Sequence, residues 1–215
     1  MNKVILMALF AATAASAFSA IVKQHVPDRL DKIRLINRAA ADKNHVLIVN
    51  VGEAIPAEDW GDVVTYAASR LQINAWTNST DKIDLAAYAL CPVKGRQDFG
   101  DKAKVCVFII NDPNVANITS APGCWCAINL CNIKRDNPDR QTLRDRYAKM
   151  ILKGLAYGCG AGVSLEPMCS LFYGGITLDG MDKTGIMITP TVYFPMLEVL
   201  KSVGGTEMLT PGIEE

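Results

Sequence analysis

The sequence predicts one α/β (α+β) domain: a twisted mixed sheet, a central helix that ends in a glycine turn, and a helix near the C-terminus. Three observations predict it. Apolar runs of strand length alternate with amphipathic segments. Residues 139–158 have helical spacing and run into Gly158, Gly160 and Gly162, and repeated glycine ends a helix. The chain of 215 residues is 50% hydrophobic and has no internal repeat, which fits one filled core.

Residues 1–17 are predicted to be a cleavable signal peptide. Lys3 precedes an apolar run, and Ala15-Ser16-Ala17 forms a small-residue cleavage pattern. A membrane anchor needs about 20 strongly apolar residues, whereas alanine, serine and threonine dominate from position 11 onward. We therefore expect a secreted or periplasmic protein that begins at Phe18 and has no transmembrane segment in its mature chain.

Residues 18–45 are predicted to form an N-terminal helical extension, because Leu30, Ile33 and Ile36 recur at helical spacing after Asp28. The domain proper is expected to span 46–215. It begins with a strand over 45–52, which is rich in β-branched residues. Residues 57–71 then carry the clearest amphipathic helix pattern in the chain.

Three more strands are predicted before the central helix. They cover 73–77, 104–111 and 124–133, with a loose connection between the first two. The strand over 104–111 is apolar enough to be buried on both faces. In the last strand the period of two puts Cys124 and Cys126 on one face and Cys131 on the other.

The central helix is predicted to start at Asp139 and to bury one apolar face, with Arg146 and Lys149 on its solvent side. A last helix is expected over 191–203. Between the two helices, Asp179 and Asp182 lie in a glycine-containing loop. They are interpreted as turn residues, with weak calcium binding as the alternative.

Composition excludes some classes of partner. The chain has 22 basic and 22 acidic side chains, so nothing favours nucleic acid or an anionic membrane surface. Its two histidines, His25 and His45, lie far apart in the sequence and do not predict a metal site.

The cysteines are expected to form disulfides after export, with at least one thiol left over because their number is odd. Their pairing is left open. A soft-metal site at Cys124, Cys126 and Cys131 is the alternative. The seven candidates are Cys91, Cys106, Cys124, Cys126, Cys131, Cys159 and Cys169.

The order of helix, glycine turn, Pro-x-Cys and Asp-containing loop resembles the active-site segment of the metzincin zinc peptidases, most closely the archaemetzincins. Their pattern is H-E-x-x-H-x-x-G-x-x-H-C, with a proline and a cysteine at +3 and +5 from that first cysteine. The chain keeps this frame at Gly160, Pro167 and Cys169. The frame continues with Leu178, Asp179, Asp182 and Gly185.

The resemblance implies that the catalytic chemistry is missing. The three histidine positions hold Lys153, Tyr157 and Val163, and the general-base position holds Gly154. None of the first three is a usual zinc donor. The first cysteine position holds Ser164, and no C-terminal Cys-x-x-Cys accompanies Cys169. We therefore expect no catalytic residue, no metal ligand and no cofactor at these positions.

The leading hypothesis is an exported, catalytically inactive metallopeptidase-like protein. It would bind an unknown peptide or protein where active relatives bind an extended peptide. One alternative is an enzyme of another class that uses Lys153, Tyr157 or a free cysteine; Lys153 and Tyr157 lie four residues apart on one helical face. A second alternative is a structural component of the envelope or cell surface.

Overall fold

The structure is a computed structural model that describes residues 46–71, 73, 75–92, 94–99 and 103–201. The predicted signal peptide, 1–17, and the predicted N-terminal helix within 18–45 lie outside these residues. Among the helices that are described, none combines the length and the apolar character needed to span a bilayer.

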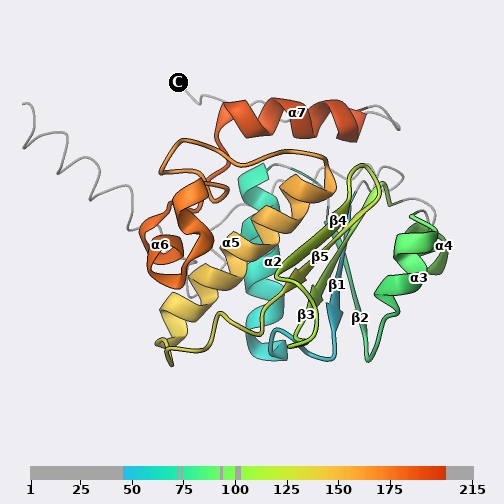
Figure 1. Ribbon diagram of the computed structural model, residues 1–215, viewed down its shortest axis with the longest axis horizontal. Helices are drawn as coiled ribbons and strands as arrows, with labels where there is room; N and C mark the ends of the chain where they lie inside the picture. Colours follow the sequence, from blue (N-terminus) through green and yellow to red (C-terminus); the bar gives the residue numbers. More distant parts are fainter. Residues whose placement is uncertain (1–45, 72, 74, 93, 100–102, 202–215) are drawn as a thin grey trace, which may run out of the picture.

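A five-stranded mixed sheet forms the centre of the domain (Figure 1). The strands are β1 (Val46–Val51), β2 (Ala75–Thr80), β3 (Val105–Ile110), β4 (Ile118–Ala121) and β5 (Trp125–Asn129). Their order is β2-β1-β3-β5-β4, and only β4 runs antiparallel to its neighbour. The predicted mixed sheet is confirmed. Every residue of β3 is buried, as its apolar sequence predicts for a central strand.

Helices cover both faces of the sheet (Figure 1). One face carries α2 (Ala57–Leu71) and α5 (Arg140–Gly158), and the other carries α3 (Leu85–Leu90) and α4 (Lys94–Phe99). The remaining helices are a short 3-10 turn (Tyr173–Ile176), α6 (Leu178–Lys183) and α7 (Pro190–Lys201). The helix predicted over 57–71 matches α2, and the last predicted helix corresponds to α7. The connection predicted to be loose contains α3 and α4.

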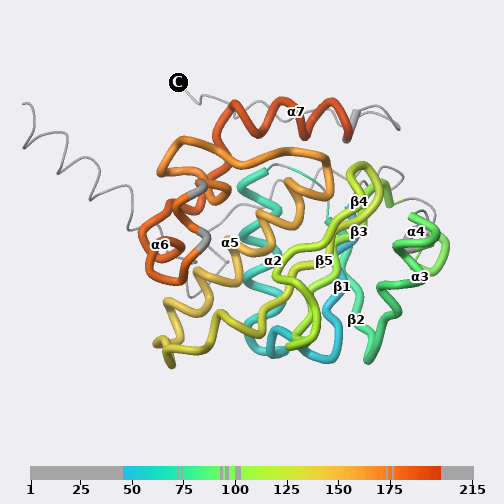
Figure 2. Tube along the Cα trace, viewed as in Figure 1, coloured from blue at the N-terminus to red at the C-terminus, as the bar shows by residue number. Residues whose placement is uncertain are grey.

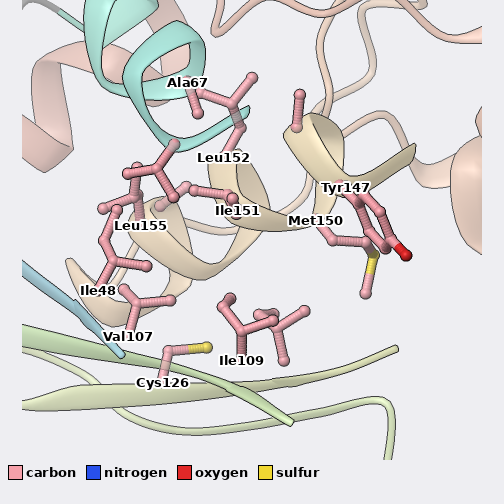
Figure 3. Close-up of a cluster of buried hydrophobic side chains, with 14 of the residues drawn as sticks. Ile48, Ala67, Val107, Ile109, Cys126, Tyr147, Met150, Ile151, Leu152 and Leu155 are labelled. Carbon is pink, nitrogen blue, oxygen red and sulfur yellow. The ribbon is translucent and has the colours of Figure 1, made fainter. Parts of the chain in front are cut away.

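The main core lies between the sheet and the pair α2 and α5. Figure 3 shows Ile151 and Leu155 of α5 beside Val107 of β3 and Ile48 of β1. A second, smaller core lies under α3, where the rings of Tyr88 and Phe108 stack with centroids 4.9 Å apart. Both faces of the sheet are therefore covered at the central strands β1, β3 and β5, whereas the residues of the edge strands β2 and β4 are partly or fully exposed.

Two predictions about the strands are wrong. The predicted strand over 124–133 is shorter at both ends. It starts only at Trp125, because Gly123 adopts a positive φ of 77° and the N–H of Cys124 closes a turn onto Ala121. It ends at Asn129, whose side-chain oxygen accepts a hydrogen bond from the N–H of Cys131. Cys126 packs in the main core, whereas Cys124 borders the second core. The two thiols thus lie on opposite faces of the sheet. Strand β4 was not predicted, since its four residues carry little apolar pattern.

The prediction that Arg146 and Lys149 face solvent is also wrong. Both side chains are buried, with exposed fractions of 1% and 4%. The chain beyond α5 turns back along the outer side of the helix, so that α6 lies beside it (Figure 2). Residues 174–184, the returning segment, cover the face of α5 that helical periodicity assigned to solvent.

Candidate functional site

The candidate site surrounds the second half of α5, whose two ends are fixed by local hydrogen bonds. At the start, the carboxylate of Asp139 accepts a hydrogen bond from the N–H of Thr142, 2.8 Å away, as expected for an N-cap. At the end, Gly160 has a φ of +80° and its N–H donates to the carbonyl of Tyr157. The predicted glycine turn is therefore present at Gly160.

Lys153, which the sequence resemblance assigns to the first histidine position, is buried with 7% of its surface exposed. Its ammonium donates a hydrogen bond to the carbonyl of Gly175, 3.1 Å away. Loss of hydration and, to a smaller extent, the positive charge of Lys149 lower the pKa of Lys153 from 10.5 to about 8, while Cys169 acts in the opposite direction. This side chain links α5 to the returning segment.

Two more cations on the same face of α5 hold that segment. Arg146 pairs with Asp136 and Asp182 through four hydrogen bonds and also donates to the carbonyl of Ile133. The Lys149 ammonium donates to the carbonyl of Met181, 2.7 Å away. Sequence reasoning missed this role. The available signal was the spacing of three cations at i, i+3 and i+7, which places them on one helical face.

Gly154, which the resemblance assigns to the general-base position, is where α5 lies against the sheet. A Cβ atom there would stand 2.6 Å from Cγ1 of Val107 and 2.8 Å from Cγ1 of Ile128, distances that side chains do not tolerate. No glutamate fits at this position unless the helix moves away from the sheet.

Tyr157 and Val163, which the resemblance assigns to the second and third histidine positions, differ in their exposure. Tyr157 is half-buried, and loss of hydration raises the pKa of its phenol. Val163 is 61% exposed. Between Val163 and the exposed Leu165, Ser164 is buried, and its N–H donates to the carbonyl of Leu171. The segment 163–165 is thus held in place with its two apolar side chains directed outward.

The structure contains none of the predicted disulfides: all seven cysteines are free thiols. Cys106 faces the second core and Cys126 the main core, so the sheet separates them. Cys159 and Cys169 are also buried, whereas Cys91, Cys124 and Cys131 are partly exposed. The three-cysteine metal site is not supported either, because Cys124 and Cys126 face opposite sides of the sheet.

The edge strand β4 lies next to the end of α5. The N–H of Gly123 donates to the carbonyl of Gly158, 2.7 Å away, which joins the β4–β5 turn to the helix. The N–H of Asn129 donates to the carbonyl of Asn117. Since hydrogen-bonded and non-hydrogen-bonded pairs alternate in an antiparallel ladder, the backbone N–H of Ser120 points away from β5, to the outer edge of the sheet.

The burial of Lys153 predicts a specific pH dependence of stability. Its folded pKa of about 8 is below the unfolded value of 10.5, so between these values the unfolded chain binds more protons and stability rises with pH. Cys126 and Cys159, whose pKa values burial raises to about 12, act in the opposite direction above the ordinary thiol pKa.

Cys126 and Cys159 are present in both the wild type and the variant Lys153→Met. Their contribution therefore cancels when the unfolding free energies of the two proteins are subtracted. We expect the difference in unfolding free energy, wild type minus variant, to rise by about 1.4 kcal/mol per pH unit between about pH 8 and pH 10. Urea titrations over this range measure it. A difference that stays constant with pH would contradict the perturbed lysine.

Solved structures similar to the chain include two archaemetzincins and a related peptidase. The archaemetzincin of Methanopyrus kandleri is 13% identical with a TM-score of 0.57, covering 78% of this chain and 99% of that one. The zinc-dependent peptidase of Methanocorpusculum labreanum is 12% identical, with a TM-score of 0.55 and coverages of 70% and 99%. The archaemetzincin of Archaeoglobus fulgidus in complex with malonate is 9% identical, with a TM-score of 0.50 and coverages of 70% and 99%.

These structures show that the chain has the archaemetzincin fold, as the sequence resemblance indicated. No family model matches the sequence, and no curated protein does.

The residues that the sequence resemblance assigns to the zinc-ligand positions do not fit a catalytic zinc ion. The Lys153 ammonium is bound to the carbonyl of Gly175, and Val163 has no donor atom. Within the described part of the chain, no group of three or more histidine, cysteine, aspartate or glutamate side chains is placed to hold a metal ion. A peptidase zinc needs three protein donors and an open position for water.

Proposed function

We propose that this chain, which has the archaemetzincin fold, is an exported protein without peptidase activity that binds an extended peptide or protein segment along β4. The observation that carries the proposal is that the residues which the sequence resemblance assigns to the catalytic positions serve the fold. Lys153 is bound to Gly175, and Gly154 allows α5 to contact the sheet. Neither position is available for zinc chemistry.

The edge of the sheet supports the binding part of the proposal. An unpaired edge accepts an extended segment through main-chain hydrogen bonds, and neighbouring side chains add specificity. Strand β4 carries no charged side chain or proline that would block such pairing. The exposed Val163 and Leu165 follow the glycine turn, where Gly160 lies close to Pro122 of the β4–β5 turn. Since a peptidase must bind peptide chains in order to cleave them, we propose that binding persists here without cleavage.

Zinc content and hydrolysis test the first part of the proposal. We expect substoichiometric zinc in purified protein, no cleavage in a broad peptide screen, and a Tm that chelators leave unchanged, because no metal-linked folding energy is present. Elemental analysis, the screen and thermal unfolding measure these three properties. Stoichiometric zinc together with hydrolysis would overturn the proposal.

Peptide binding is tested by a pair of substitutions at Ser120. Peptides selected from a random display library are expected to lose about tenfold or more in affinity for Ser120→Pro, since proline removes the outward N–H and is tolerated on an edge strand. Ser120→Ala keeps that N–H and should bind as the wild type does. Equal affinities for the two variants would show that β4 is not the docking edge.

Export is proposed because of the leader-like residues 1–17. Intact mass of the protein from its source organism is expected to correspond to a chain that begins at Phe18. Retention of Met1 would contradict this part alone.

A further inference from the structure

Three large apolar side chains are exposed on two neighbouring segments of the described chain. Val163 and Leu165, after the glycine turn, are 61% and 81% exposed, and Phe194 of α7 is 59% exposed. The hydroxyl of Thr191, at the start of α7, donates to the carboxylate of Glu166, 2.9 Å away, which joins the two segments. We call these three side chains the apolar face. Apolar side chains that gather on a surface mark a place of contact with another segment or molecule.

The outward side of α7 is apolar at its centre. Between Thr191 and Val199, the exposed residues are Thr191, Phe194, Pro195 and Glu198. They occupy the i, i+3, i+4 and i+7 positions of a single helical face. The opposite side of the helix packs into the main core. Helix α7 therefore has an outer side on which a second amphipathic helix could lie.

The apolar face lies at the end of the sheet where β1 begins. Val46, the first residue of β1, pairs with Val105 of β3, and Gly158 at the end of α5 packs against that same valine. The hydroxyl of Tyr193, beside Phe194 on α7, donates to the carbonyl of Leu71, the last residue of α2. Figure 1 shows α7 across this end of the sheet. Residues 18–45 therefore join the domain close to the apolar face.

Residues 28–42 have a sequence that suits this face. Leu30, Ile33 and Ile36 recur at helical spacing, and a helix of this length is about 22 Å long, enough to extend along α7. Only residues 43–45 separate it from β1, and three residues span at most about 11 Å. The segment is thus held near the face at high effective concentration. Residues 18–45 also carry six basic and three acidic side chains, an excess that complements the carboxylates of Glu166 and Glu198.

We propose that residues 28–42 cover the apolar face as a helix, with the apolar side of that helix against Phe194 and Leu165. The contact removes apolar surface of both segments from water, which stabilises the covered state. The occupant of the face is thus a segment of this chain. The face borders the surface proposed for peptide binding but does not include the outer edge of β4, so the two proposals can fail separately.

A double-mutant cycle in the full chain tests the contact. Ile33→Ser is expected to lower the Tm by about 4 °C or more, because it removes a buried apolar side chain. Leu35→Ser changes the opposite side of the predicted helix and should have little effect. Phe194→Ala should lower the Tm of the wild type but change that of Ile33→Ser much less, since the partner is already lost. Equal effects of the two serine variants, or additive effects of Ile33→Ser and Phe194→Ala, would overturn the proposal.

A photo-crosslinking group identifies the occupant. With p-benzoylphenylalanine in place of Phe194, irradiation is expected to give a product of monomer mass in which position 194 is joined to residues 28–42. Mass spectrometry of its peptides locates the bond. The same group in place of Leu90, an exposed residue of α3 on the other side of the sheet, should not reach this segment. Products of dimer mass alone, or crosslinks from position 194 to other segments only, would show that residues 28–42 do not cover the apolar face.

Discussion

Gly154→Ala is expected to destabilise the protein by about 3 kcal/mol, at the upper end of the range for overpacking. The added methyl group would stand 2.6 Å from Val107 and 2.8 Å from Ile128, and both of these side chains are fully buried in central strands. Gly154→Glu should prevent folding altogether, because it adds a buried charge to the same clash. Urea denaturation followed by circular dichroism measures both variants.

Gly61→Ala is the matched control. Gly61 also lies inside a helix, α2, but nothing stands within 4 Å of its missing Cβ. Alanine should therefore stabilise the protein by about 0.5–1 kcal/mol through its higher helix propensity. If the two alanine variants change stability in the same direction, the close approach of α5 to the sheet is wrong.

Arg146→Met should cost about 3 kcal/mol, because it leaves a buried carbonyl and two carboxylates without their cation. The side chain is 1% exposed and forms two ion pairs of 2.6 Å, with Asp136 and Asp182. Arg146→Lys should recover only part of the loss, since an ammonium cannot form the paired hydrogen bonds of a guanidinium. Chemical denaturation at neutral pH measures these changes.

The control for Arg146 is Lys183→Met, which breaks the exposed pair with Asp179 and should change stability by less than about 1 kcal/mol. The pH dependence of stability in acid is a second test of the Arg146 ion pairs. Hydrogen bonds from Arg146 hold the pKa of the Asp136 carboxyl below its ordinary value, so this stabilisation is lost as the pH falls through the folded pKa. The difference in unfolding free energy between wild type and Arg146→Met should therefore become smaller below about pH 3.9. A difference that stays the same in acid would contradict a stabilising ion pair between Arg146 and Asp136.

The sequence predicted the elements whose own residues determine them. Helix α2 matches its predicted bounds because its apolar residues fall on one face, and β3 was recognised because it is apolar throughout. The glycine turn was found at Gly160 because a positive φ restricts the choice of residue.

Other features depend on contacts between distant segments, and these were missed. Arg146 and Lys149 look like surface residues until the returning segment covers them. Strand β4 owes its existence to β5, since its own sequence, Ile-Thr-Ser-Ala, has little apolar pattern. The site at Lys153 was located through the frame set by Gly160. Its bond to Gly175 joins residues 22 apart in sequence, and no local pattern encodes it.

The cations on α5 also bear on local unfolding of the native domain, which hydrogen exchange detects. Helix α5 meets the sheet through close contacts at Gly154 and Gly158, so its amides should exchange with solvent only when the whole domain unfolds. The returning segment, in contrast, is joined to the helix by hydrogen bonds from Arg146, Lys149 and Lys153. We therefore expect the amides of residues 174–184 to exchange at a lower free energy than those of α5, through a local opening in which the sheet and α5 stay folded; native-state hydrogen exchange measures the difference.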